Sequence, residues 1–293
     1  MIAMAPLPLL GLPPYASTLE RAWRLFFFAF CGLVLLFLIS PILIVLPISF
    51  NATPFLSFPK GDWSLRWYED FFFNDRWTTA VKNSVIIAFF STILSTSLGT
   101  LAALGLSRPY FPARAAVMAV LISPMIVPVV ITAAALFFFY ANPLMVTSQP
   151  IIILNNTYTG VILAHTLLAT PFVVITVSAT LTGFDQSLIR AGASLGGSPA
   201  LVFRRVMLPL IAPGVISGAL FAFVTSWDEV ICVLFIGSSD QRTLPRQMFS
   251  GIREMISPTI TAAATVLIAL AIVMLVTVEL LRRRTERLRG ITT

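Results

Sequence analysis

Long stretches without any charged residue divide this chain of 293 residues. The longest runs from Arg114 to Asp185, and four others each separate two charged residues by more than 20 positions. An α-helix needs about 20 mostly apolar residues to cross the hydrocarbon core of a bilayer. The stretches therefore predict a membrane protein, and a composition of 58% hydrophobic and 11% charged residues excludes an ordinary soluble domain.

The same pattern predicts an all-α membrane protein with six transmembrane helices. The region between Arg114 and Asp185 is long enough for two helices, because polar residues at 148–150 and 155–157 interrupt it. We expect the spans at residues 25–48, 83–106, 115–140, 159–183, 210–236 and 259–281.

The distribution of basic residues predicts the orientation of these helices. The N-terminal tail, the 107–114 and 184–206 loops and the C-terminal tail hold twelve of the 19 lysines and arginines, with a net charge of +8. The other side has a net charge of −1. Because cytoplasmic loops are enriched in Lys and Arg, we expect both termini in the cytoplasm. The overall charge of +7 follows from this asymmetry and gives no reason to invoke nucleic acid.

Two tails flank the predicted transmembrane domain at residues 25–281. The tail at residues 1–24 has its basic residues, Arg21 and Arg24, after its apolar part, whereas a secretory signal has them before its apolar core. We therefore expect a cytoplasmic tail there. The tail at residues 282–293 is basic, and its arginines are expected to set topology and attract anionic headgroups; they are Arg282, Arg283, Arg284, Arg287 and Arg289.

A polar, glycine-bearing segment at residues 184–209 resembles the cytoplasmic loop of bacterial ABC-importer permeases. That loop has the pattern Glu-Ala-Ala, three residues, Gly, a longer spacer, an apolar residue and Leu-Pro. In this chain Arg190 takes the place of the glutamate, and Gly192 takes the place of the second alanine. The matching positions are Arg190, Ala191, Gly192, Gly196, Val206, Leu208 and Pro209.

The resemblance implies the six-helix permease fold of type I ABC importers and an ATPase-docking role for the loop. The turn at residues 196–199 can end one helix and start the next, with Pro199 suited to a first helical turn. The chain has no Gly-x-x-x-x-Gly-Lys phosphate loop, so we expect no catalytic residue and no bound cofactor, with ATP and Mg on a partner ATPase. The expected docking residues are Arg190, Ala191, Gly192, Gly196, Ser198, Arg204, Arg205 and Pro209.

Segments nearer the C-terminus resemble the spermidine/putrescine permease family, namely residues 227–230, 243–250, 257–259 and 261–265. This resemblance implies a bacterial inner-membrane subunit that pairs with a second permease, as a hetero-dimer, above two ATPase subunits. It also implies a periplasmic solute-binding protein and a polyamine substrate. Importers of ferric iron, phosphonate, sulfate and molybdate share the loop and remain alternatives, as does a stand-alone secondary carrier.

Asp228 and Glu229 are the candidate substrate-pathway residues, together with Trp227. Both acids fall inside the fifth predicted span, where ionisable groups are costly and normally face a cavity or a partner. Adjacent helical residues point about 100° apart, so we expect one acid to line the pathway and the other to pair with a neighbouring helix or subunit. Trp227 could add a cation–π contact to an ammonium group. Structural ion pairing of both acids is the alternative interpretation.

Three further features have structural interpretations. A face of small residues in the second span favours close helix packing; it consists of Ser95, Gly99, Ala102 and Ala103. The single histidine, His165, is expected to be structural, because no metal-ligand spacing surrounds it. Cys31 and Cys232 are isolated, so no disulfide or metal site is expected.

Two segments are expected to lie outside the membrane on the outer side. Residues 242–253 contain Pro245, which opens a short amphipathic turn, and residues 63–73 are rich in aromatic side chains. Together they could form a face on which a solute-binding protein docks. Interfacial aromatic and arginine anchoring is the alternative, which is favoured for residues 63–73.

Overall fold

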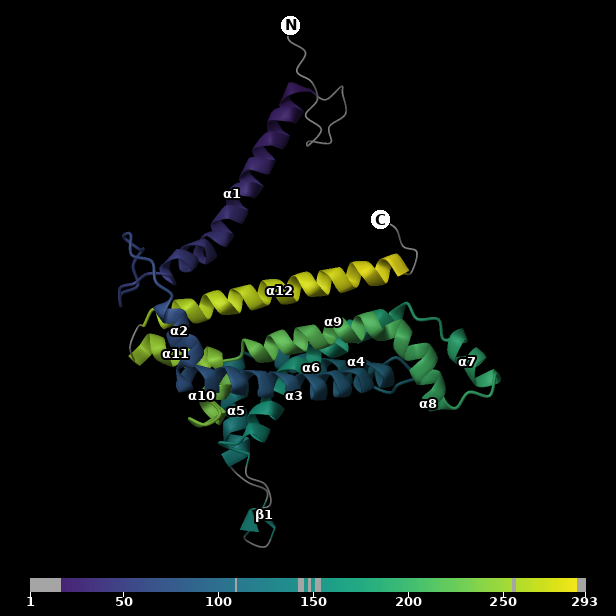
Figure 1. Ribbon diagram of the computed structural model, residues 1–293. Helices are drawn as coiled ribbons and strands as arrows, with labels where there is room; N and C mark the ends of the chain where they lie inside the picture. The colour runs from purple at the N-terminus through teal and green to yellow at the C-terminus, as the bar shows by residue number, and fades with distance from the viewer. Residues whose placement is uncertain are drawn as a thin grey trace. The chain divides into compact units, whose positions relative to one another are not determined.

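The computed structural model describes residues 17–108, 110–141, 145–146, 149–150, 154–254 and 257–288, and most of them are helical (Figure 1). The outer parts of the two predicted tails, residues 1–16 and 289–293, lie outside the described residues. The elements in chain order are α1 (Thr18–Ile48), α2 (Arg66–Phe73), α3 (Asp75–Leu106), α4 (Arg114–Ile126), α5 (Val129–Ala141), β1 (Met145–Val146), β2 (Gln149–Pro150), α6 (Tyr158–Thr182), α7 (Ser187–Ser194), α8 (Pro199–Val202), the π-helical turn η2 (Phe203–Met207), α9 (Leu208–Trp227), α10 (Ile231–Ile236), α11 (Leu244–Glu254) and α12 (Thr259–Leu288).

The chain divides into two compact units, which we describe separately. Unit 1 comprises residues 1–68 and 257–276, and unit 2 comprises residues 69–256 and 277–293. β1 and β2 form a small antiparallel ribbon in unit 2, in which Val146 is the register partner of Gln149. This two-stranded ribbon departs from the all-α prediction.

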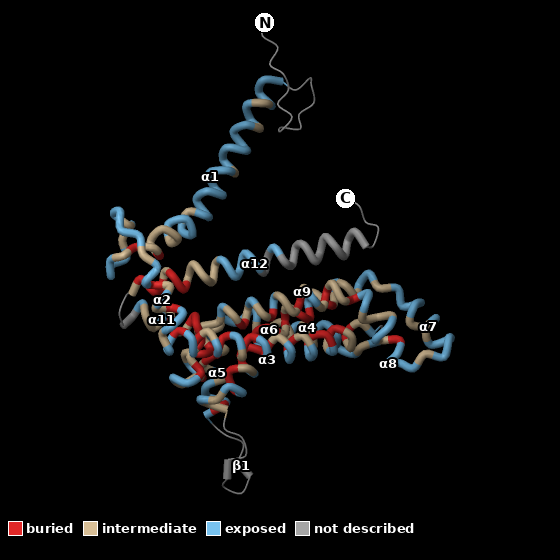
Figure 2. Tube along the Cα trace, viewed as in Figure 1, coloured by how far each residue is buried: buried red, intermediate tan, exposed pale blue. Residues whose placement is uncertain are grey.

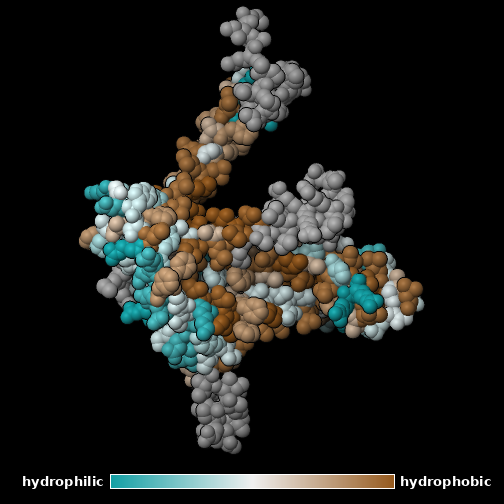
Figure 3. Space-filling view, in the orientation of Figure 1, coloured by the Kyte–Doolittle hydropathy of each residue, from teal (hydrophilic) through white to brown (hydrophobic). Residues whose placement is uncertain are grey.

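Helix α1 dominates unit 1. It begins at a capping box in which Ser17 Oγ accepts from the Glu20 N–H and Glu20 Oε2 accepts from the Ser17 N–H. None of its residues is buried, and its surface is largely hydrophobic (Figure 3). A helix that is apolar all round needs lipid or another subunit against it, because exposure of its apolar surface to water is unfavourable.

The segment after α1 is held by hydrogen bonds to α2. The indole N–H of Trp67 donates to the Asn51 carbonyl oxygen at 2.6 Å, and the hydroxyls of Ser49 and Tyr68 lie 2.7 Å apart. The Asn51 side-chain amide donates to the Ser57 carbonyl oxygen at 2.8 Å. These bonds order the part of the predicted aromatic segment 63–73 that belongs to unit 1.

The core of unit 2 is built around α6, which packs on α3 and α9. Buried residues concentrate along these helices (Figure 2). One apolar cluster joins α3 to α6 and α9, and it consists of Ala103, Ala169, Val173, Val177, Ile211 and Ala222. A second joins α6 to α3, α5 and α10, and it consists of Ile87, Ala133, Tyr140, Val161, Ala164, Leu168, Cys232, Val233 and Ile236.

Glycines allow the three long helices to approach closely. A Cβ added at Gly99 of α3 would lie 2.7 Å from Val173 Cβ, and one added at Gly218 of α9 would lie 3.0 Å from Val173 Cα. The sequence prediction of a small-residue face on α3 is confirmed, because Ser95, Gly99 and Ala103 are all buried. Such faces bring helix backbones together where no hydrophobic driving force acts between helices in lipid.

Four helical stretches among the described residues are long and apolar enough to cross a membrane: 18–48, 75–106, 158–182 and 199–227. The predicted third span is wrong as a single helix, because α4 and α5 meet at a bend of 103°. Val127 adopts an extended conformation immediately before Pro128, as expected for a residue whose helical conformation the proline ring disfavours. The part of α12 at residues 259–273 is apolar but shorter.

The predicted fifth span, residues 210–236, is also interrupted. α9 ends at Trp227 and α10 begins at Ile231, so Asp228 and Glu229 lie between two helices and not within one. The expectation that these acids point about 100° apart on a continuous helix is therefore wrong. Asp228 is the C-terminal cap of α9, and the helical hydrogen bonds stop there.

Replacing Gly99 tests the close packing of α3 on α6. We expect Gly99→Ala to lower the free energy of unfolding by about 1–3 kcal/mol, because the added methyl group overlaps Val173. The control is Gly105→Ala on the same helix, where an added Cβ meets no atom within 4 Å. Thermal melting of both purified variants in detergent checks this. Equal melting temperatures would contradict the packing.

Candidate functional site

The predicted docking loop folds as a helical hairpin made of α7 and α8. α7 is capped at its C-terminal end by Leu195, and Gly196 follows with φ of +81°. Ser198 then caps α8 by accepting from the Leu201 N–H at 3.3 Å, and Pro199 occupies its first position. The sequence prediction that residues 196–199 end one helix and start the next is confirmed.

Two glycines bring α7 against α8. A Cβ added at Gly192 would lie 3.1 Å from a methyl group of Val202, and one added at Gly197 would lie 2.8 Å from the Gly192 carbonyl oxygen. Val202 is buried, whereas no residue of α7 is. The hairpin is thus packed around Val202, a residue that the sequence analysis did not single out.

The outer surface of the hairpin combines arginines with exposed leucines. Leu195 is 89% exposed, which is unusual for a large apolar side chain on an otherwise polar loop. Arg190 lies on α7, while Arg204 and Arg205 lie in η2. The exposed members of this surface, which we call the docking face, are Leu188, Arg190, Ala191, Leu195, Gly196, Ser198, Leu201, Arg204, Arg205 and Pro209.

Asp185 stabilises the start of α7. Its carboxylate accepts from the Ser187 N–H at 2.8 Å and from the Ser187 hydroxyl at 2.7 Å. These hydrogen bonds, with a smaller contribution from the positive charge of Arg190, lower the pKa of Asp185. The carboxylate is therefore ionised at neutral pH and offsets one of the positive charges of the loop.

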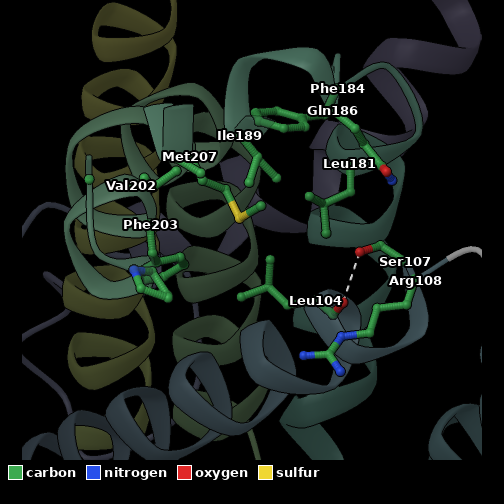
Figure 4. A pocket seen from close by; sticks show the side chains of 13 residues that line it. Leu104, Ser107, Arg108, Leu181, Phe184, Gln186, Ile189, Val202, Phe203 and Met207 are labelled. Atoms are coloured by element: carbon green, nitrogen blue, oxygen red, sulfur yellow. Dashed lines mark hydrogen bonds between the residues drawn. The ribbon is translucent and has the colours of Figure 1, made fainter. Parts of the chain in front are cut away.

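A cavity of about 470 Å³ lies between the docking hairpin and the ends of α3 and α6 (Figure 4). Its walls are mainly apolar, and the side chains of Leu104, Leu181 and Met207 surround it in the close-up. The Ser107 hydroxyl at its edge donates to the Leu104 carbonyl oxygen at 2.8 Å. No sequence pattern indicated this cavity, because its walls come from two stretches far apart in the chain, residues 104–108 and 181–207.

The break between α9 and α10 holds the predicted pathway residues. Trp227 stacks on Phe223 with ring centroids 5.5 Å apart. Asp228 is exposed, and its side chain makes no hydrogen bond or ion pair within the described part of the chain. Glu229 Oε1 accepts from the Cys232 N–H at 2.8 Å, so it caps the first turn of α10.

A buried polar cluster lies next to the C-terminal end of α9. The Ser226 hydroxyl is 2.8 Å from His165 Nδ1 and accepts from the Ser91 hydroxyl at 2.8 Å. Each member comes from a different helix, so the cluster joins α3, α6 and α9. Ser91 and His165 are fully buried, and His165 Nε2 has no partner among the described residues. These contacts agree with the structural role predicted for His165.

The loop between α10 and α11 is bound to the N-terminal parts of α3 and α6. The Asn83 side-chain amide donates to the carbonyl oxygens of Asp240 and Arg242 at 2.8 and 3.0 Å, and Tyr158 donates to Asn83 Oδ1. The Leu244 N–H donates to Ser84 Oγ at 2.8 Å. Where a short amphipathic turn was predicted after Arg242, the chain forms an amphipathic helix of 11 residues, α11.

The family described as "Binding-protein-dependent transport system inner membrane component" matches residues 95–287, which include the docking hairpin and the α9–α10 break. This match covers more than half of the chain. The chain belongs to this family of transport permeases, and it is therefore an inner-membrane subunit of a binding-protein-dependent transporter.

Named permeases are similar to this chain over most of its length. The spermidine/putrescine transport system permease protein PotC of Haemophilus influenzae is 32% identical over 87% of this chain and 96% of its own. The putrescine transport system permease protein PotI of Escherichia coli is 31% identical over 79% of this chain and 82% of its own. A probable molybdenum ABC transporter permease protein of Haloferax volcanii is 34% identical over 58% of this chain and 63% of its own.

Solved structures show the same fold. A chain of a bacterial ABC transporter involved in the import of the acidic polysaccharide alginate superposes with a TM-score of 0.69, 14% identity and coverage of 92% of this chain and 99% of its own. A chain of an amino acid ABC transporter superposes with a TM-score of 0.54, 16% identity and coverage of 74% of this chain and 98% of its own. The chain therefore has an ABC transporter permease fold.

Replacing Gly196 tests the hairpin turn. We expect Gly196→Val to destabilise α7 and α8 by about 1–2 kcal/mol, because a β-branched residue is strained at positive φ. Gly196→Asn is the matched control, since asparagine tolerates this conformation. Hydrogen exchange of the α7 and α8 amides measures the difference. Equal protection in both variants would show that the turn does not depend on the left-handed conformation.

Proposed function

We propose that the chain forms half of the translocation pathway of an ATP-driven importer for polyamines such as spermidine or putrescine. The observation that carries the proposal is the Asp228 carboxylate at a helix break of a transport permease, which is exposed and has no hydrogen-bond or ion-pair partner among the described residues. The similarity to PotC and PotI over most of the chain supports it. A carboxylate in the membrane region selects for a cationic substrate.

The proposed subunit crosses the membrane six times with both termini in the cytoplasm. The four long apolar stretches supply four crossings, α4 and α5 together supply a bent fifth, and the 30 residues of α12 supply the sixth. The charge distribution supports the orientation, because the docking hairpin and the 107–114 loop then lie on the basic, cytoplasmic side. The structure does not describe the side chains of residues 282–288, which include four arginines of the predicted basic tail.

In this proposal the docking face binds a separate ATPase subunit, which carries ATP and Mg. Exposed Leu188, Leu195 and Leu201 supply apolar contacts that a soluble loop would not display. Arg190, Arg204 and Arg205 supply positive charge for an acidic partner surface. A second permease subunit, a second ATPase and a periplasmic solute-binding protein complete the proposed assembly.

The two acids have different proposed roles. Asp228 continues an exposed face of α9 that includes Phe221 and Val224, while Ala222 and Ser226 on the opposite face are buried. A carboxylate on that face cannot lie against lipid without a large cost, so it faces the pathway or the second permease. Glu229 is already occupied as the cap of α10. We therefore assign Asp228 to substrate binding and Glu229 to capping the backbone of α10.

An oxyanion importer is the second candidate function, because the molybdenum permease relative matches part of the chain. It requires an anion to pass the Asp228 carboxylate, and like charges repel in a region of low dielectric. Uptake of spermidine against molybdate by the assembled transporter in liposomes distinguishes the two.

Charge reversal tests the docking face. We expect Arg204→Glu combined with Arg205→Glu to release the ATPase subunit, because two attractive contacts become repulsive. The double Lys variant keeps the charge, and Arg114→Glu alters the neighbouring basic loop without touching the docking face. Co-purification of the ATPase and substrate-stimulated hydrolysis are the measurements. Full assembly and coupling in the double Glu variant would remove the docking assignment.

Neutralising the two acids separately tests the pathway. We expect Asp228→Asn to reduce polyamine uptake about tenfold or more, because a charge-assisted contact contributes about 1.5–3 kcal/mol. Glu229→Gln keeps an oxygen that accepts from Cys232, so its uptake should fall much less, whereas Glu229→Ala should lower the melting temperature. Assembly of each variant with the ATPase is the control. Unchanged uptake in Asp228→Asn, with intact assembly, would overturn the assignment.

A further inference from the structure

We propose that the cavity behind the docking hairpin binds an anionic phospholipid of the cytoplasmic leaflet, with an acyl chain inside and the phosphate on Arg108. The inference rests on the proposed orientation of the subunit, which places this cavity at the cytoplasmic boundary of the membrane. It concerns a site that neither docks the ATPase nor lines the substrate pathway.

The first observation is the size and lining of the cavity. Its volume of about 470 Å³ lies within the range of small-molecule sites, about 300–1,000 Å³. Apolar side chains from α3, α6, α7 and η2 line most of it, so an apolar group gains free energy by entering. The main apolar lining residues are Leu104, Leu181, Phe184, Ile189, Val202 and Met207.

The second observation is the charge at the edge of the cavity. Arg108 lines it from just beyond the C-terminal end of α3, and its side chain runs beside Leu104 (Figure 4). Its guanidinium forms no ion pair within the described part of the chain, and it is exposed. Gln186, from the connection between α6 and α7, adds a neutral polar group to the lining.

The third observation is the position of the cavity along the helices. α3 ends at Leu106 and α6 ends at Thr182, and both ends contribute to the cavity. Basic pockets between transmembrane helices on the cytoplasmic side bind anionic lipid headgroups. An apolar cavity with Arg108 at its edge, unpaired among the described residues, matches an amphiphile that has an anionic head, and it does not match a cationic polyamine.

The test measures lipid retained by the assembled transporter after reconstitution in mixed phosphatidylcholine and phosphatidylglycerol. Native mass spectrometry should show retained phosphatidylglycerol, and Arg108→Gln should reduce it about fivefold, since one arginine near the surface contributes about this factor. Arg114→Gln, in the same loop but outside the cavity, is the matched control and should keep the lipid. If both variants lose the same amount of phosphatidylglycerol, general surface charge explains the retention, and the proposed site is wrong.

Three further measurements separate the acyl chain from the phosphate and do not depend on the Arg108 variant assembling. Leu104→Trp should fill the cavity and expel the lipid, whereas inorganic phosphate alone should not compete for it. A photoreactive group near the end of the acyl chain of phosphatidylglycerol should label residues 181–207 in the wild-type transporter. Labelling confined to other segments, or competition by phosphate, would overturn the proposal. None of these experiments measures polyamine uptake, so the lipid proposal and the proposed substrate are tested independently.

Discussion

The contact of α3 and α9 with α6 at Gly99, Gly218 and Val173 is the interaction on which unit 2 depends. Both glycines approach the same residue of α6, so Val173 lies against the backbones of both neighbouring helices. The apolar cluster that contains Val173 also holds the start of α9, through Ile211. The docking hairpin is joined to the start of α9 through η2, so the glycine packing of α9 on α6 also positions the hairpin.

Hydrogen bonds between polar side chains add direction to this packing. Apolar contacts tolerate small rotations of one helix on another, whereas the bonds of Ser226 to His165 and to Ser91 require one alignment. The same cluster lies immediately before Trp227 and Asp228. The exposed carboxylate of Asp228 is thus presented by a helix end whose rotation is fixed by buried bonds.

The sequence allowed most of the membrane helices to be located, because long uncharged stretches and basic loops depend only on local composition. It also located the hairpin turn, since Gly196, Ser198 and Pro199 each have a local conformational preference. The third span was predicted as one helix although Pro128 lies within it, because a proline predicts a disturbance but not an angle of 103°. The cavity and the role of Val202 could not be found, because both depend on segments that meet only in the folded chain.

The hydrogen bonds of Asn83 and Ser84 to the 240–244 loop have a consequence for movement. α3 contacts the start of α9 through Ala103 beside Ile211, and the loop between α10 and α11 through Asn83 bound to Arg242. Three residues of α10 are buried, Cys232, Val233 and Ile236, and the Ile236 carbonyl oxygen accepts from the Asn156 N–H. Helices α3, α9 and α10 are therefore braced on either side of residues 228–230. The connection at residues 228–230 therefore joins two helices that are each held in place by α3 or α6, and the Asp228 carboxylate lies in this connection.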